Sequence, residues 1–240
     1  MDNRFIDKLV RYQPLSEAEI RTLAAATARS RRVPARQDRI REGDRPGPVF
    51  VVLQGWAFRY KLLPSGTRQV LAFLMPGDSC DLNIGLLAEM DHSIQTITPA
   101  VIATIERAEM ESIMDRNAGI ARAMYIGQLI DEATMRAWIT SMGRRTSTER
   151  VAHLMCELYI RARNIGLATG AHFALPLSQL LLADALGMTP VHLNRVVKAL
   201  RLAHVMTLRR GSIVIDDPAK LVQIAGFDEN YLHRRLCLAA

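Results

Sequence analysis

Several side chains that can contact DNA bases lie close together in the segment GMTPVHLNRVVKAL. An arginine such as Arg195 can donate to the O6 and N7 acceptors of guanine, and an asparagine such as Asn194 can pair with adenine. Val191 can contact the methyl group of thymine. The chemistry available here is recognition of base edges, and the predicted base-reading residues are Thr189, Val191, His192, Asn194 and Arg195.

This segment also has the signals of a helix that begins at a defined residue. Thr189 can act as an N-cap, and Pro190 then falls at the first helical position, where its missing N–H costs nothing. The predicted buried stripe is formed by Leu193, Val196, Val197 and Leu200. This stripe leaves the polar residues at the start of the helix toward the outside.

A second helix precedes this one, and a strand pair follows it. ALPLSQLLLADALGM predicts a helix from about Ser178 to Leu186, and Gly187 permits a sharp turn between the two helices. VMTLRRGSIVIDD predicts two strands joined at Gly211. This order is typical of a winged helix-turn-helix, whose second helix enters the major groove of DNA. The predicted phosphate contacts are Ser178, Lys198, Arg209 and Arg210.

The basic residues concentrate in the C-terminal part of the chain. The net charge of the 240 residues is +7, of which residues 141–240 contribute +6 and residues 178–210 alone contribute +4. A basic region predicts an acidic partner, either nucleic acid or a membrane surface. Exposed Arg, His and Asn are also common as solvated side chains. The coincidence of this charge with the helix-turn-helix signals is what favours DNA.

The remaining composition is typical of a globular protein in a reducing compartment. The chain of 240 residues is long enough for one large or two ordinary domains, and its hydrophobic content of 49% is ample for buried cores. Cys80, Cys156 and Cys237 lie far apart without a CxxC pair, so neither a zinc motif nor a disulfide framework is indicated. The N-terminal residues include Asp2 and Asp7, and no uncharged apolar run reaches about 18 residues. We therefore expect a cytoplasmic protein that does not enter the membrane.

The N-terminal half predicts a helical segment followed by a β-rich domain. Residues 5–30 have helical spacing, and Ser16 with Glu19 resembles a capping box. From Val33 to Ile105, short β-branched or aromatic runs are separated by turn signals such as PSGT and MPGD. The expected strands are VFVVL, WAFRYKLL, RQVLAFL, SIQTIT and VIATI. Strands at this spacing predict an antiparallel sandwich or barrel.

A long helix is expected between the β-rich domain and the helix-turn-helix. ESIMDRN predicts a short helix, and AGIARAMYIGQLIDEATMRAWITSM predicts a long one with apolar residues on more than one face. One face could cover the sheets and another could form a dimer contact; the alternative is a helix buried within one subunit. GRRTSTER then predicts a domain boundary and a hinge. The predicted dimerisation residues are Ile120, Met124, Ile130 and Trp138.

These segments together resemble the Crp/Fnr family of transcription regulators over nearly the full length of the chain. The resemblance is carried by GTRQVLAFLMPGD, by DHSIQTITPAVIATIER and most specifically by LSQLLLADALGMTPVHLNRVVKALR with its TLRRGSIVI wing. It implies an α+β chain: a cyclic-nucleotide-binding-like sensor β-roll of the jelly-roll type at 1–117, a dimerisation helix at 118–142 and a winged helix-turn-helix DNA-binding domain at 143–240. It also implies a homodimer on a palindromic operator, with Arg195 as the base-contacting arginine and RNA polymerase as a candidate partner.

The residues that would bind a cyclic nucleotide depart from the family pattern. Asp81 and Leu82 replace the Gly-Glu pair that holds the ribose, and His92-Ser93 stands in place of Arg-Ser. Leu82 cannot accept a hydrogen bond, and a histidine is a weaker anion partner than an arginine near pH 7. We therefore expect a degenerate effector pocket that does not bind cyclic AMP. No cofactor is predicted, because residues 1–79 lack the grouped cysteines of an iron–sulfur cluster.

Two other classes of function remain as alternatives. An enzyme would need a nucleophile with a base or a metal cluster, and the chain has no GxSxG, HExxH, P-loop or GxGxxG motif. A ligand-sensing module whose winged helix binds protein would favour an acidic or neutral second helix, whereas this one is basic. We therefore expect a DNA-binding regulator and no enzymatic activity.

Overall fold

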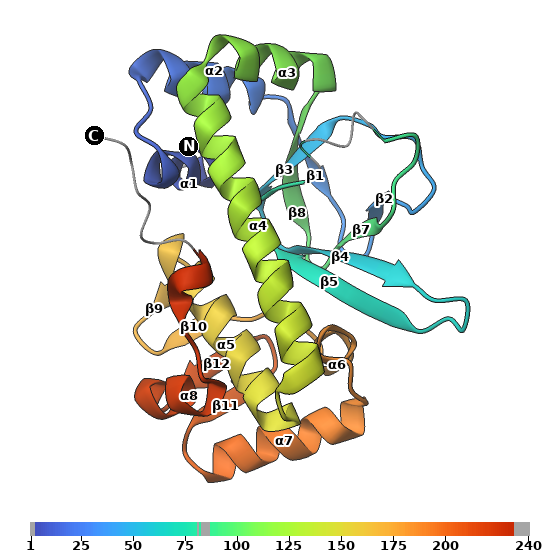
Figure 1. Ribbon diagram of the computed structural model, residues 1–240, viewed down its shortest axis with the longest axis vertical. Coiled ribbons are helices and arrows are strands. Elements are labelled where there is room, and N and C mark those ends of the chain that lie inside the picture. Colours follow the sequence, from blue (N-terminus) through green and yellow to red (C-terminus); the bar gives the residue numbers. More distant parts are fainter. Residues whose placement is uncertain (1–2, 81, 83–86, 233–240) are drawn as a thin grey trace. The chain divides into compact units, whose positions relative to one another are not determined.

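The computed structural model describes residues 3–80, 82 and 87–232, and it divides into two compact units (Figure 1). The first unit contains the chain up to Leu62 together with Leu71–Asp131. The second contains Leu63–Val70 and the described residues from Glu132 to Leu232. The domain boundaries expected at 117/118 and 142/143 stay predictions, and each unit is described by itself below.

The first unit begins with two helices, α1 (Arg4–Tyr12) and α2 (Glu17–Ala26), where the sequence predicted one helical segment. The break has a local cause, because Gln13 precedes Pro14 and has extended dihedral angles, φ −150° and ψ 128°. The predicted capping box is confirmed. Ser16 Oγ accepts from the Glu19 amide at 3.3 Å, and Glu19 Oε2 accepts from the Ser16 amide at 2.8 Å.

Two four-stranded antiparallel sheets form the β-roll within the described residues, with strand orders β1-β8-β3-β6 and β2-β7-β4-β5. All five predicted runs are strands, and the sandwich prediction is confirmed. The sequence did not predict β1, β2 and β6, which are short and polar. The strands are β1 Ser30–Val33, β2 Asp38–Ile40, β3 Val49–Gln54, β4 Ala57–Leu62, β5 Arg68–Leu74, β6 Ser79–Cys80, β7 Ser93–Thr96 and β8 Ala100–Ile105.

Strand β3 is buried on both faces, which explains why VFVV reads as a continuous apolar run. Val49 and Val51 belong to a core that also contains Phe5 of α1 and Leu23 of α2. The alternate residues of β3 belong to a second core, inside the roll, with Ile94 and Ile102. Each such buried side chain stabilises the fold by about 1.5–3 kcal/mol relative to an exposed one.

Helix α3 (Arg107–Arg116) and helix α4 (Ala118–Arg144) confirm the predicted short and long helices. Figure 1 shows α4 as one unbroken helix. The expected break in the helical pattern at GRRTSTER is present but short, because α4 ends at Arg144 and α5 begins at Ser147. Thr146 caps α5 in a capping box with Glu149, a signal that the letters TSTE contain and that the sequence analysis missed.

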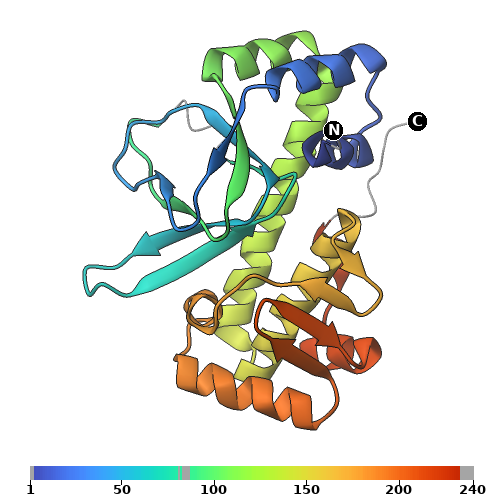
Figure 2. The same cartoon turned by 180° about the vertical axis from the view of Figure 1, so that it is seen from behind.

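The second unit contains the helix-turn-helix and a four-stranded sheet with the order β11-β12-β10-β9 (Figure 2). The predicted helices and the hairpin are confirmed, whereas β9, β10, α8 and η2 were not predicted. No helix in the described part of the chain has both the length and the apolarity to cross a membrane. The elements are α5 Ser147–Asn164, β9 Ala168–Thr169, β10 His172–Ala174, α6 Gln179–Leu186, α7 Pro190–Leu202, β11 Met206–Arg209, β12 Ser212–Ile215, α8 Pro218–Ala225 and η2 Glu229–Leu232.

A buried histidine lies in the core of the second unit. His153 is 3% exposed and packs edge-on to Phe227, with ring centroids 5.1 Å apart, and stacks on Tyr231 at 5.7 Å. Burial, with a smaller effect of Arg145, lowers the pKa of His153 from 6.5 to about 4. The ring is therefore neutral in the folded protein across the physiological range.

We expect this histidine to make the protein less stable in mild acid. Between pH 6.5 and about pH 4, His153 is protonated in the unfolded chain but neutral in the folded protein. The contribution of His153 to the free energy of unfolding is therefore fully present above pH 6.5 and decreases as the pH falls below 6.5. The loss at pH 5 relative to pH 8 is about 2 kcal/mol. Denaturant unfolding of the protein and of His153→Phe at both pH values measures it. An equal loss in both proteins would contradict the assignment.

Candidate nucleic-acid interface

Helices α6 and α7 are joined by a three-residue turn, Gly187 to Thr189, and both begin at the predicted N-caps. Ser178 Oγ accepts from the Leu181 amide at 3.1 Å, and Thr189 Oγ1 accepts from the His192 amide at 3.2 Å. Gly187 has φ +60°, the left-handed conformation that glycine adopts without strain. The local sequence thus determines where both helices begin and where the first one ends.

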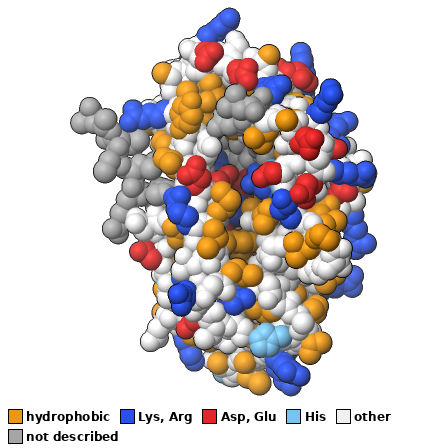
Figure 3. Space-filling view, turned by 45° about the vertical axis from the view of Figure 1, so that its right-hand side comes forward, with side chains coloured by type: hydrophobic (Ala, Val, Ile, Leu, Met, Phe, Trp, Pro, Cys, Tyr) orange, Lys and Arg blue, Asp and Glu red, His pale blue; other side chains and the backbone are white. Residues whose placement is uncertain are grey.

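The predicted division of α7 into a buried and an exposed face is confirmed. Leu193, Val196 and Leu200 are buried, and Val197 is partly buried. On the other side, Val191 is 63% exposed. The polar residues Thr189, His192, Asn194 and Arg195 are also exposed. Figure 3 shows histidine, basic and hydrophobic side chains exposed near one another at its lower end, where α7 lies.

The exposed basic residues of this region are not neutralised by acidic neighbours. Lys198 of α7, Arg209 of β11 and Arg210 in the turn before β12 are all exposed. Among the described residues, no carboxylate lies within ion-pair distance of these side chains or of Arg195. The charges are therefore available to meet phosphate groups.

The single acidic side chain of the helix-turn-helix has its own partner. Asp184 of α6 accepts from Arg68 Nε at 2.8 Å and from Arg68 Nη2 at 2.7 Å. Arg68 belongs to the short stretch Leu63–Val70 that is part of the same compact unit. Both donors reach Oδ2, so the one acidic charge of the helix-turn-helix forms an ion pair with Arg68.

Next to the turn between α6 and α7, the guanidinium of Arg150 of α5 lies within hydrogen-bond distance of three backbone carbonyls. Its Nη1 donates to the Leu186 carbonyl at 2.7 Å, and its Nη2 lies 3.4 Å from the carbonyls of both Met142 and Arg145. A cation at the C-terminal ends of α6 and α4 also opposes the negative end of each helix dipole. The role of Arg150 could not be predicted from the sequence, because its acceptors are backbone atoms that no residue pattern reveals.

The four residues of the degenerate effector pocket lie in different surroundings. Asp81 is outside the described residues, and Leu82 packs against the core that contains α1 and α2 rather than the roll interior. His92 is 8% exposed, and its Nδ1 lies 2.6 Å from Asp91 Oδ1. The hydrogen bond with His92 lowers the pKa of Asp91.

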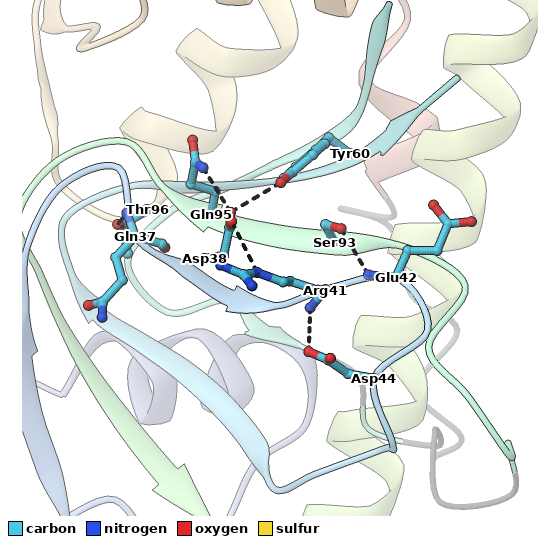
Figure 4. Close-up of polar contacts among 9 residues, drawn as sticks. All are labelled: Gln37, Asp38, Arg41, Glu42, Asp44, Tyr60, Ser93, Gln95 and Thr96. Atoms are coloured by element: carbon cyan, nitrogen blue, oxygen red, sulfur yellow. Dashed lines mark hydrogen bonds and ion pairs between the residues drawn. The ribbon is translucent and has the colours of Figure 1, made fainter. Parts of the chain in front are cut away.

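The fourth residue, Ser93, takes part in a polar network that joins β2, β4 and β7 (Figure 4). Ser93 Oγ accepts from the Glu42 amide at 2.9 Å. In the same network, Asp38 Oδ1 accepts from Gln95 Nε2 at 2.8 Å and from the Tyr60 hydroxyl at 3.1 Å. The Ser93 hydroxyl oxygen therefore already has a backbone partner in the fold.

The predicted dimerisation residues need correction. Ile120, Met124 and Ile130 are 0%, 3% and 8% exposed, so they fill the interior of the subunit and cannot reach a partner. Trp138 is partly buried and donates from Nε1 to Glu157 Oε2 at 2.9 Å. For this face of α4 the alternative, a helix buried within one subunit, is correct. The exposed apolar side chains of α4 are Tyr125, Leu129, Met135 and Ile139.

Two family models match the chain, in the order in which the two parts occur. A cyclic nucleotide-binding domain matches residues 30–117, and a Crp-like helix-turn-helix domain matches residues 149–224. The nitrogen fixation regulation protein FixK of Bradyrhizobium diazoefficiens is 26% identical over 185 residues, which cover 77% of this chain and 76% of FixK. The transcriptional activator protein FnrL of Cereibacter sphaeroides is 26% identical over 202 residues, 82% of this chain and 80% of FnrL.

Solved structures share the fold. The structure of FixK2 from Bradyrhizobium japonicum superposes with a TM-score of 0.73 at 23% identity and covers 83% of this chain and 98% of that one. CooA from Carboxydothermus hydrogenoformans gives a TM-score of 0.69 at 15% identity, over 88% of this chain and 97% of CooA. The β-roll, the long helix and the winged helix-turn-helix therefore have the architecture that the resemblance implied. This protein belongs to the Crp/Fnr family, whose members are DNA-binding transcription regulators and not enzymes.

Proposed function

We propose that this regulator is a homodimer that binds an approximately palindromic operator through α7 of each subunit. The observation that carries the proposal is the exposed face at the start of α7, where His192, Asn194 and Arg195 lie beside unpaired basic charge. Residues in this place reach base edges when the second helix of a helix-turn-helix enters the major groove. Two such helices would contact half-sites about 34–36 Å apart.

Dimer formation is supported by the exposed side of α4. At about 100° per residue, Tyr125, Leu129, Met135 and Ile139 fall within about one third of the helix circumference. Their exposed fractions are 55%, 52%, 47% and 72%, which is a large apolar stripe for a surface helix. Pairing the same stripe from two subunits would remove it from water in the manner of a coiled coil.

We expect Leu129→Glu to separate the subunits, because a charge placed in the centre of the stripe must be desolvated when two helices pair. The dimer dissociation constant should rise by at least about 100-fold, measured by sedimentation equilibrium. Ala219→Glu is the matched control, since it adds the same charge at an exposed position of α8. A dimer of unchanged affinity in Leu129→Glu would place the interface elsewhere.

The sensor roll is proposed not to respond to cyclic AMP. Leu82 packs into the helix-side core, and His92 bonds to Asp91, so neither supplies the ribose and phosphate contacts that the family pattern requires. Titration of the purified protein with cyclic AMP in a calorimeter should give no binding heat at cyclic AMP concentrations up to about 1 mM. Binding with a dissociation constant in the micromolar range would be detected under these conditions.

The partners that follow from this proposal are double-stranded DNA and RNA polymerase, and we place the protein in the bacterial cytoplasm, where both occur. The relative FnrL is by name a transcriptional activator. An activator must contact polymerase as well as its operator. Transcription from a promoter that carries the selected operator, with and without this protein, distinguishes activation from repression.

A further inference from the structure

A carboxylate is completely buried in the second unit. Glu157 of α5 is 0% exposed, and burying an isolated charge is costly unless hydrogen bonds and an opposite charge compensate. Three of the described side chains lie within hydrogen-bond distance of this carboxylate. Its Oε2 accepts from Trp138 Nε1 at 2.9 Å and from the Tyr231 hydroxyl at 3.0 Å, and its Oε1 lies 3.4 Å from Arg161 Nη1.

These donors come from three separate segments of the chain. Trp138 lies in the C-terminal half of α4, Arg161 lies one turn after Glu157 on α5, and Tyr231 lies in η2. A single carboxylate thus joins the long helix, the first helix of the DNA-binding part and the segment that follows α8. We call Glu157, Trp138 and Tyr231 the carboxylate joint.

The carboxylate joint links the C-terminal half of α4 to α5, the helix that follows it. The second compact unit includes α4 from Glu132, so Trp138 already belongs to the body that contains α7. Arg150 adds the contacts to Met142 and Arg145 at the end of the same helix. The last turns of α4 therefore contact α5 at two places, Glu157 and Arg150, which lie about two turns of helix apart on α5.

We infer that Glu157 is a positioning residue for operator recognition, because it fixes the C-terminal turns of α4 against the DNA-binding helices. The orientation of α7 then follows the direction of α4, and any pivot lies before Trp138 in α4 rather than at the α4–α5 junction. This inference rests on the proposed dimer. In a dimer, the orientation of α4 in each subunit sets the distance between the two α7 helices, and this distance must match the spacing of the half-sites.

The chain offers a matched pair of variants to test this role. Tyr231→Phe removes the hydroxyl bonded to Glu157 and keeps the ring that stacks on His153. Tyr159→Phe is the control, because its hydroxyl donates to the Gly170 carbonyl at 2.8 Å in the same unit but does not touch α4. Glu157→Gln keeps an acceptor and loses the charge that pairs with Arg161.

The first readout is operator spacing. Each variant is titrated with duplexes whose half-sites are moved apart or together by one and two base pairs. We expect the preference for the best spacing to fall by at least about fivefold in Tyr231→Phe and Glu157→Gln and to persist in Tyr159→Phe. Weaker binding by the same factor at every spacing would overturn the inference, because it would show that Glu157 only stabilises the fold.

The second readout needs neither DNA nor a dimer. In a Trp56→Phe background the fluorescence comes from Trp138, since the chain has two tryptophans. Glu157→Leu removes both acceptor oxygens, so the indole of Trp138 should lose its partner, and its emission should move to longer wavelength with stronger acrylamide quenching in Glu157→Leu but not in Tyr159→Phe. Unchanged emission would overturn the inference. If the unmodified protein binds no palindrome at any spacing, the proposed function fails, and this readout still decides whether Glu157 holds Trp138.

Discussion

Arg195→Ala is expected to abolish discrimination at one base pair of each half-site while leaving general affinity for DNA largely intact. A bidentate arginine contact to guanine discriminates against other bases by about 1–3 kcal/mol. Arg195 is exposed on the first turns of α7 and has no acidic partner in the described structure, so its guanidinium is free to make this contact. Binding to operators that carry each of the four bases at every position measures the effect.

The matched control for this prediction is Arg209→Ala in the β11–β12 hairpin. Arg209 is exposed next to the turn at Gly211, and a phosphate contact from this place should strengthen binding to all sequences alike. We expect weaker binding by a similar factor for every operator and a salt dependence reduced by about one counterion. Loss of base preference in Arg209→Ala, with preference retained in Arg195→Ala, would reverse the two assignments.

The second large effect is expected at Arg150, which supports the turn of the helix-turn-helix from below. Replacement by alanine removes a charged donor from the Leu186 carbonyl at 2.7 Å and from two more carbonyls at 3.4 Å. Hydrogen bonds to charged groups contribute about 1.5–3 kcal/mol, so Arg150→Ala should lower the free energy of unfolding by about 2–3 kcal/mol. Denaturant unfolding with fluorescence detection measures this change.

Two further variants make the Arg150 prediction specific. Arg150→Lys should recover only part of the loss, because one ammonium group cannot reach carbonyls at the ends of two different helices as the planar guanidinium does. Arg201→Ala removes an exposed arginine from α7 and should change stability by less than about 0.5 kcal/mol. Equal stability of the Arg150→Ala and unmodified proteins would show that the carbonyls are satisfied by water instead.

Most of the secondary structure could be predicted because its determinants are local. The capping residues Ser16, Ser178 and Thr189 all cap the helices that they were expected to begin. Five strands followed from runs of β-branched and aromatic residues. The missed strands β1, β2 and β6 are two to four residues long, and their pairing with distant strands, such as Ser30 with Ala103, leaves no local pattern.

The exposed and buried faces of α4 could not be distinguished from the sequence. Apolar residues occur around most of the helix, so Ile120 and Ile130 looked as available to a partner as Leu129 and Ile139 do. Tertiary packing decides between them: Ile120 joins Phe5 and Met110 in one core, whereas Ile139 is 72% exposed. The periodicity of the sequence predicts which apolar residues share one face of α4. Only the neighbouring elements of the fold determine which of these faces is buried within the subunit.

The long-range contacts of Glu157 and Arg150 were also beyond prediction. Glu157 and Tyr231 are 74 positions apart, and Arg150 is 36 positions from Leu186. A buried glutamate within the amphipathic pattern of α5 has no feature that separates it from an exposed one in the sequence. By contrast, the exposure of His192, Asn194 and Arg195 was predictable, because it follows directly from the N-cap and the helical period.

The central claim is tested most directly by selecting binding sites from a random duplex pool with the purified protein and no added effector. We expect an enriched palindrome whose half-sites lie one helical turn apart, about 10–10.5 base pairs centre to centre, or a multiple of it. A guanine that loses its preference in Arg195→Ala should occur in each half-site. Salt-sensitive binding to every duplex, without an enriched motif, would contradict the account, because the basic face would then bind phosphate without reading bases.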